Sequence, residues 1–151
     1  MTVTSLRAQE NVEDSRWETA VRCIKKYEGW HGPEHHPYVA YGHRIRKGEK
    51  FPARLTESEG DSILRKDLKE MCALFRHLGK DSLLVACLAY QVGPYKLLGY
   101  GRIPKSTLIR KLEAGNRNIY VDFIRYCHYK GKKISSIERR RKEEYRLLFM
   151  P

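Results

Sequence analysis

The segment from Ser82 to Val92, SLLVACLAYQV, constrains the fold more than any other stretch of this chain. Drawn as a helix, it carries apolar side chains on nearly every side, and a helix of that kind is buried in a protein core. Other helices must therefore cover it. The chain has 151 residues, which is long enough for one domain with such a core.

Amphipathic segments that can cover this core lie on both sides of it. Apolar residues at helical spacing predict a helix over 13–27. A capping box of Thr56 and Glu59 begins a second helix, which ends at Gly79. The remaining predicted helices cover 106–115, 118–129 and 136–149.

Residues 30–54 break the helical pattern. The run YVAYGHRI is typical of short β-strands, and RKGEK after it is typical of a turn, so we expect a small β-hairpin region. The fold class is therefore α+β, with a small β-lobe and a larger helical lobe. We expect one domain over 13–151, and before it, over 1–12, either a disordered N-terminus or the remnant of an export signal.

The net charge of +12 indicates an acidic partner. Nucleic acid, an anionic lipid surface and an acidic cell-wall polymer all fit this charge, and solubility alone is a further explanation. No apolar run approaches the roughly 18 residues of a membrane span. The basic residues are scattered over all the predicted helices without a recognised nucleic-acid motif, which makes nucleic acid the least favoured partner.

No metal site and no cofactor are expected. The four cysteines, at positions 23, 72, 87 and 127, form no C-x-x-C pair and lie in predicted helices beside apolar residues, which favours buried free thiols. The histidines at 31, 35 and 36 do not form a zinc-binding helix face, because Gly32, Pro33 and Pro37 interrupt any helix there.

Glu28 stands at the end of the first predicted helix, directly before Gly29. A carboxylate is disfavoured at a helix C-terminus, and that field together with partial burial is expected to raise its pKa. A raised pKa suits a general acid, although an exposed glutamate without a role is the alternative. Glu34 lies six residues further on, and two carboxyl groups across a loop can flank a glycosidic bond.

Several ordered segments resemble the phage-type lysozyme family, the muramidases of glycoside hydrolase family twenty-four. In chain order they are YEG at 27–29, YGH at 41–43, LTESEGDSILRKDL at 55–68, AYQVG at 89–93, STLIRKLEAGN at 106–116 and ERRRKEE at 138–144. The resemblance runs from about Trp17 to Phe149. It implies a lysozyme-like fold with a cleft between the two lobes, and a peptidoglycan-cleaving glycosidase.

The resemblance also implies roles for single residues. Glu28 resembles the family's general acid. His43 resembles a histidine that pairs with an aspartate on the next helix, here Asp67, and such an ion pair is expected to raise the histidine pKa and lower the aspartate pKa.

Further positions follow from the same comparison. Gln91 resembles a position that faces the cleft, and we assign Tyr41, Tyr90 and Gln91 to substrate binding. Arg139 or Arg140 resembles an arginine of a structural pair that opens the last helix.

The chain departs from the family in the loop after Glu28. The family has an aspartate and then a threonine there, which position the attacking water. Here no aspartate occurs between Glu28 and Asp61, Glu34 is the loop's one acid, and Tyr38 falls where the threonine would be. Glu34 and Tyr38 are therefore candidate catalytic residues beside Glu28.

This departure leaves three readings of the function open. The first is a hydrolase with two carboxyl groups, and the second is a lytic transglycosylase that uses a single acid. The third is a lysozyme-fold protein that binds the wall without cutting it. We expect peptidoglycan glycan strands as partner, a monomer, and a location outside the cytoplasm, or in the cytoplasm until release if the chain comes from a phage.

Overall fold

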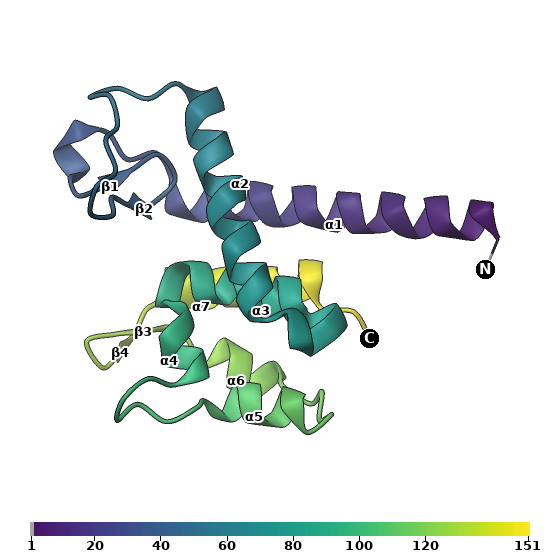
Figure 1. The fold of residues 1–151 in the computed structure, drawn as a ribbon. Coiled ribbons are helices and arrows are strands. Elements are labelled where there is room, and N and C mark those ends of the chain that lie inside the picture. The colour runs from purple at the N-terminus through teal and green to yellow at the C-terminus, as the bar shows by residue number, and fades with distance from the viewer. Residues whose placement is uncertain (1) are drawn as a thin grey trace. The chain divides into compact units, whose positions relative to one another are not determined.

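The computed structural model describes residues 2–151, which are mostly helical with two small antiparallel sheets (Figure 1). The α+β class predicted from the sequence is confirmed. The chain divides into two compact units, one up to Glu70 and one from Met71 onward. The first unit contains α1 (Val3–Glu28), the 3-10 helix η1 (Pro33–His35), β1 (Tyr38–Val39), β2 (His43–Arg44) and most of α2 (Glu57–Leu74).

Helix α1 begins ten residues earlier than the sequence pattern indicated. The side chain of Thr2 accepts a hydrogen bond from the backbone N–H of Ser5, so it caps a helix that starts at Val3. Residues 3–12, for which we expected either a disordered N-terminus or the remnant of an export signal, are thus helical in the structure; Met1 lies outside the described residues. These residues are exposed, so no apolar face marked them as helical, yet Leu, Arg, Ala, Gln and Glu favour a helix.

The hairpin between α1 and α2 is short but defined. Strands β1 and β2 pair antiparallel, with Val39 opposite His43, and an isolated bridge joins His31 to Ala40. The turn between the strands uses the left-handed backbone region at Ala40 (φ 53°) and Gly42 (φ 91°). The predicted small β-region is confirmed in this place.

Charged contacts tie α1 to α2 within the first unit. Arg65 donates to both carboxylate oxygens of Glu18, at 2.6 and 2.9 Å, and to Asp61 at 2.7 Å. Lys25 donates to Asp61 at 2.6 Å and to Glu57 at 2.8 Å. Bidentate, charge-assisted hydrogen bonds of this kind fix geometry as well as adding stability. They hold the end of α1, where Glu28 lies, against the first turns of α2.

The capping box that opens α2 is also present. The N–H of Glu59 donates to the Thr56 hydroxyl at 3.1 Å, and the N–H of Thr56 donates to the Glu59 carboxylate at 3.0 Å. The helix ends at Leu74 rather than at Gly79, and a 3-10 segment with a non-helical Gly79 (φ 60°) follows.

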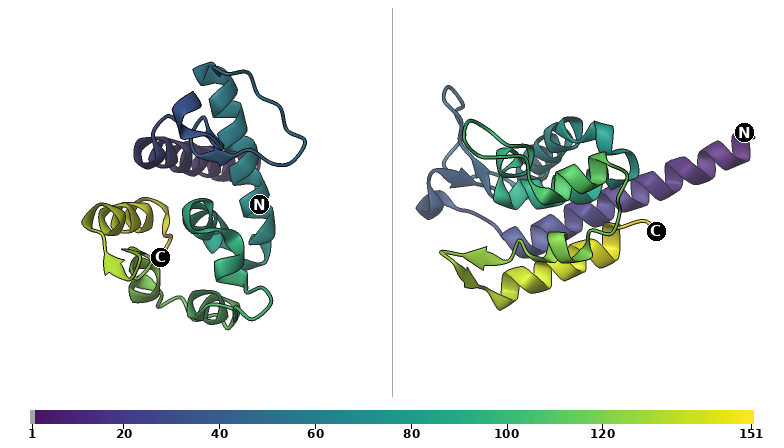
Figure 2. Two further views of the ribbon diagram at one scale, coloured as in Figure 1. Left: turned by 90° about the vertical axis from the view of Figure 1, so that its left-hand side faces the viewer. Right: turned by 90° about the horizontal axis from the view of Figure 1, so that it is seen from below.

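The second unit is built around the apolar segment that the sequence placed at its centre. Helix α3 (Ser82–Val92) has every residue from Leu83 to Ala89 buried, and it lies beside α7 (Figure 2). The other elements of this unit are η2 (Arg76–Asp81), α4 (Pro94–Leu98), α5 (Thr107–Glu113), α6 (Tyr120–Ile124), β3 (His128–Tyr129), β4 (Lys132–Lys133) and α7 (Ser135–Leu148).

The predicted helix over 118–129 is wrong beyond Ile124. The chain leaves the helix there and forms the hairpin β3–β4, which turns at Lys130 (φ 50°) and Gly131 (φ 77°) and leads into α7 (Figure 2). Two consecutive residues with positive φ suit a tight hairpin turn, and the glycine allows it. Helix α4, which begins at Pro94, was not predicted either.

The cysteines are free thiols, as the sequence predicted. Cys23, Cys87 and Cys127 are buried, and Cys72 is half-buried. Among residues 2–151, no cluster of three or more His, Cys, Asp or Glu side chains forms a metal site. In the same part of the chain, no helix combines the length and the apolar character that crossing a membrane requires.

Candidate active site

The carboxyl group of Glu28 lies against the hairpin turn. Glu28 is the last residue of α1 and is half-buried. A Cβ atom placed on Gly42 would lie 2.9 Å from Glu28 Oε2 and 3.4 Å from its Cδ. The backbone of Gly42 therefore packs directly against this carboxyl group, and no larger residue fits there without moving it. The turn between β1 and β2 positions the acid at the helix end.

Glu34 and Tyr38 lie on a different part of the hairpin region. Glu34 belongs to η1 and is exposed, and its carboxylate lies 3.3 Å from Nδ1 of His35. Tyr38 opens β1 and is also exposed, with its ring centroid 6.2 Å from that of His31.

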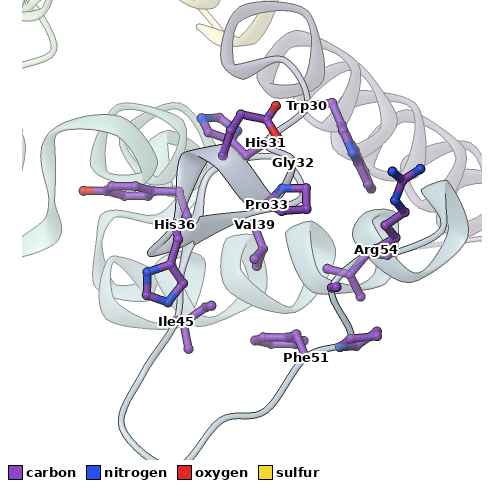
Figure 3. A pocket seen from close by; sticks show the side chains of 14 residues that line it. Trp30, His31, Gly32, Pro33, His36, Val39, Ile45, Phe51 and Arg54 are labelled. Atoms are coloured by element: carbon purple, nitrogen blue, oxygen red, sulfur yellow. The ribbon is translucent and has the colours of Figure 1, made fainter.

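Both residues line a cavity of about 560 Å³, which we call the loop cavity (Figure 3). Its walls come from the segment after α1, from both strands and from the loop before α2. They are formed by Trp30, His31, Gly32, Pro33, Glu34, His36, Tyr38, Val39, Ile45, Phe51, Pro52, Ala53, Arg54 and Leu55. Glu28 is not one of these residues. The structure thus brings Glu34 and Tyr38 together and does not bring Glu28 into the same cavity.

Tyr41, predicted to bind substrate, is held by neighbours within the first unit. Its hydroxyl donates to Glu57 Oε1 at 3.1 Å. Its ring meets Trp30 edge-on, with centroids 5.2 Å apart, and the Lys25 ammonium lies 5.1 Å from its centroid. Burial and the hydrogen bond to Glu57 raise the pKa of Tyr41. These contacts fix the ring at the hairpin turn, two residues from the end of β1.

Tyr90 and Gln91, the other predicted substrate-binding residues, lie in the last turn of α3. Tyr90 is half-buried and Gln91 is exposed. The guanidinium of Arg141 donates to the side-chain oxygen of Gln91. Within the second unit, Gln91 is therefore held by α7.

Helix α7 carries a buried charged cluster that the sequence reasoning missed in part. Arg139, one of the two arginines considered, is exposed, whereas Arg140, Arg141 and Glu144 are buried. Glu144 lies 3.2 Å from the Nε atoms of both Arg140 and Arg141. The spacing of the three residues, one glutamate three and four positions after two arginines, was the signal that could have found this cluster.

His43 and Asp67 are brought together and buried. Nδ1 of His43 lies 2.6 Å from Asp67 Oδ2. Burial raises the pKa of the Asp67 carboxyl, although His43 acts in the opposite direction, so the expectation of a lowered aspartate pKa is wrong. The carboxyl group is far enough from water that desolvation of its charge outweighs the neighbouring imidazole.

A second carboxylate, not predicted from the sequence, contacts the same ring. Nε2 of His43 lies 2.9 Å from Glu49 Oε1. The backbone N–H of Arg46 donates to Glu49 at 2.6 Å and, with His43, lowers the pKa of Glu49. Each ring nitrogen of His43 therefore lies within hydrogen-bond distance of a carboxyl group, Nδ1 close to Asp67 and Nε2 close to Glu49.

Comparison with known proteins assigns the fold and then the family. The structure matches the muramidase domain of SpmX from Asticaccaulis excentricus with a TM-score of 0.67 and 19% sequence identity, covering 88% of this chain and 96% of that domain. The fold is therefore lysozyme-like, as the sequence predicted. The sequence profile of the phage lysozyme family matches residues 21–144, and the chain belongs to that family. Curated protein sequences gave no significant match.

Proposed function

We propose that this protein cleaves the glycan strands of peptidoglycan, with Glu28 as the general acid. The observation that carries the proposal is the position of Glu28: half-buried at the end of α1 and packed against Gly42, in a chain of the phage lysozyme family. A carboxylic acid held in one place can give its proton to the oxygen of the glycosidic bond as that bond breaks.

The position of Glu34 favours a mechanism with one acid. Glu34 is exposed beside His35 and lines the loop cavity, which Glu28 does not line. In a single-acid reaction, Glu28 protonates the leaving oxygen, the N-acetyl group of the sugar attacks the anomeric carbon, and a sugar hydroxyl then displaces it. That hydroxyl returns its proton to Glu28, so no water is consumed and the product is an anhydro sugar.

A zymogram on cell walls tests the proposal. Wild-type protein should clear the wall, and Glu28→Gln should not. Glu13→Gln removes a carboxylate from an exposed position on the same helix and should leave clearing unchanged. Lysis by Glu28→Gln at the wild-type rate overturns the role of Glu28. Absence of lysis by the wild type, with retained binding to walls, favours the alternative of a wall-binding protein that does not cut.

Mass spectrometry of the released fragments separates the two cleavage mechanisms. Fragments one water lighter than hydrolysis products identify the single-acid route. Hydrated fragments together with a loss of activity in Glu34→Gln identify the two-carboxylate route, with Tyr38 as a candidate to orient the water or the sugar.

The charge of the chain suits this substrate. A net charge of +12 attracts the protein to the carboxylates of wall peptides and to acidic wall polymers, most strongly at low salt. Action on peptidoglycan places the protein outside the cytoplasm at the time when it works.

A further inference from the structure

The loop cavity has the dimensions of a ligand site, and Glu28 is not among the residues that line it. Its volume of about 560 Å³ falls within the roughly 300 to 1,000 Å³ that is usual for small-ligand pockets. It therefore fits a small molecule or a few residues of a peptide rather than a folded partner. Figure 3 shows Val39, Ile45 and Phe51 gathered along one wall, and Trp30 and Arg54 along another.

The cavity carries a cation without a partner. Among residues 2–151, Arg54 makes no hydrogen bond or ion pair with another residue, and it is exposed to solvent. A free guanidinium beside apolar side chains binds a carboxylate through two parallel hydrogen bonds. Two further cations, Lys47 and Lys50, have no such partner among the described residues and lie in the chain between Ile45 and Phe51, which both line the cavity. The field at this side of the cavity thus favours an anion.

The remaining polar lining limits which anion fits. The carboxylate of Glu34 is part of the wall, so a polyanion such as nucleic acid meets a like charge inside the cavity. The aliphatic and aromatic wall of Val39, Ile45 and Phe51 suits small alkyl side chains. One unpartnered arginine, one carboxylate, the imidazoles of His31 and His36 and an apolar wall together match a short peptide that has a carboxylate, amide or amine groups and aliphatic side chains.

We propose that the loop cavity binds a short peptide by its free carboxylate, with Arg54 holding the carboxylate and Val39, Ile45 and Phe51 contacting the side chains. The identity of that peptide rests on the proposed function: it is the stem peptide that peptidoglycan strands carry. The protein then recognises glycan strands through their peptide substituents, at a place separate from the acid that cleaves the sugar chain.

Calorimetry on the 151-residue chain tests this inference. The titrated protein carries Glu28→Gln, so that no cleavage occurs, and the ligand is a free stem tetrapeptide without sugars. We expect saturable binding, weakened about tenfold or more by Arg54→Gln, since one charge-assisted contact is lost. Arg44→Gln is the matched control: it removes an equally exposed, unpartnered arginine that does not line the cavity, and binding should stay unchanged.

A second experiment changes the peptide and uses the same Glu28→Gln protein. The same tetrapeptide with its terminal carboxylate amidated should bind as weakly as the free peptide binds to Arg54→Gln. Equal binding of the free and amidated peptides overturns the proposal, as does an Arg54→Gln variant that binds normally. Binding of a chitotetraose in place of the peptide makes the cavity a saccharide site and overturns it too.

The two proposals fail separately. Wild-type lysis of walls without binding of the stem peptide overturns only the peptide site. Peptide binding that depends on Arg54, in a protein that does not lyse walls, leaves the peptide site in place and overturns the proposed cleavage.

Discussion

The carboxylate of Asp67 lies 2.6 Å from Nδ1 of His43, and both side chains are buried. This contact joins β2 to α2 within the first unit. Arg46 adds a hydrogen bond to Glu70 on the same helix at 2.8 Å. The groups that face the His43 ring or its partners are therefore Asp67, Glu49, Arg46 and Glu70, and their ionisation sets how the stability of this unit depends on pH.

Asp67→Asn should destabilise the protein most at acid pH. Burial raises the pKa of Asp67 in the folded state above its unfolded value. The folded protein therefore favours the protonated carboxyl group. The stability that this group contributes is fully present at low pH and is lost as pH rises through the folded pKa. The cost of the substitution, about 1–3 kcal/mol for a buried hydrogen-bond partner, should thus shrink as pH rises through that value. Urea unfolding at a series of pH values measures it. A cost that grows with pH would mean that the anion is the stabilised form.

Glu49→Gln should have the opposite pH dependence. The N–H of Arg46 and the His43 ring lower the pKa of Glu49 in the folded state. Its contribution to stability is present above the unfolded pKa and is lost as pH falls through the folded pKa. The variant should therefore be less stable than the wild type near neutral pH and nearly equal to it in strong acid. The same unfolding series measures this, with Glu10→Gln, an exposed acid on α1, as control.

How far the sequence predicted the fold depended on the kind of signal. Both ends of helix α3 were predicted from the sequence, because a nearly continuous apolar run followed by a glycine is typical of a buried helix and its C-terminal end. The Thr56–Glu59 cap was recognised because its two hydrogen bonds are local. The hairpin at 128–133 was missed because its residues are exposed and lack an alternating pattern, so only the turn at Gly131 marked it.

The candidate site was predictable only where local sequence determines it. Glu28 before a helix-ending glycine is a local feature, and the structure has it. The packing of Gly42 against its carboxyl group and the contact of Glu49 with His43 depend on how the hairpin folds back, which spacing alone does not give. The raised pKa of Asp67 depends on how deeply its carboxyl group is buried, and the positions of charged residues in the sequence do not predict that burial.

The thiols should react slowly in the native protein. Burial raises the pKa of Cys72, the least buried of the four, to about 11, so little of it is thiolate at pH 8. A chromogenic disulfide reagent at pH 8 should label far less than one thiol per chain within the time that denatured protein needs for complete labelling. Denatured protein should give four thiols per chain. Rapid labelling of one native thiol would show that Cys72 is accessible and ionised.

The turn residue Gly42 offers a test of how the acid is positioned, because the same hairpin region contains a matched glycine. Gly42 and Gly48 both have positive φ, 91° and 88°. A Cβ on Gly42 would lie 2.9 Å from the Glu28 carboxylate, whereas a Cβ on Gly48 has no neighbour within 4 Å. Substitution by alanine thus introduces the same backbone strain at both positions but a contact with the acid at only one.

Gly42→Ala should therefore abolish most wall lysis, while Gly48→Ala should retain it. Both variants should lose about 1–2 kcal/mol of stability, since alanine at positive φ is strained wherever it stands. Only Gly42→Ala forces the Glu28 carboxyl group out of its place, and a general acid displaced by a fraction of an ångström delivers its proton poorly. Lysis rates on purified walls, compared at a temperature where both variants are folded by circular dichroism, measure the difference. Equal lysis by the two variants would show that the contact between Gly42 and Glu28 does not position the acid.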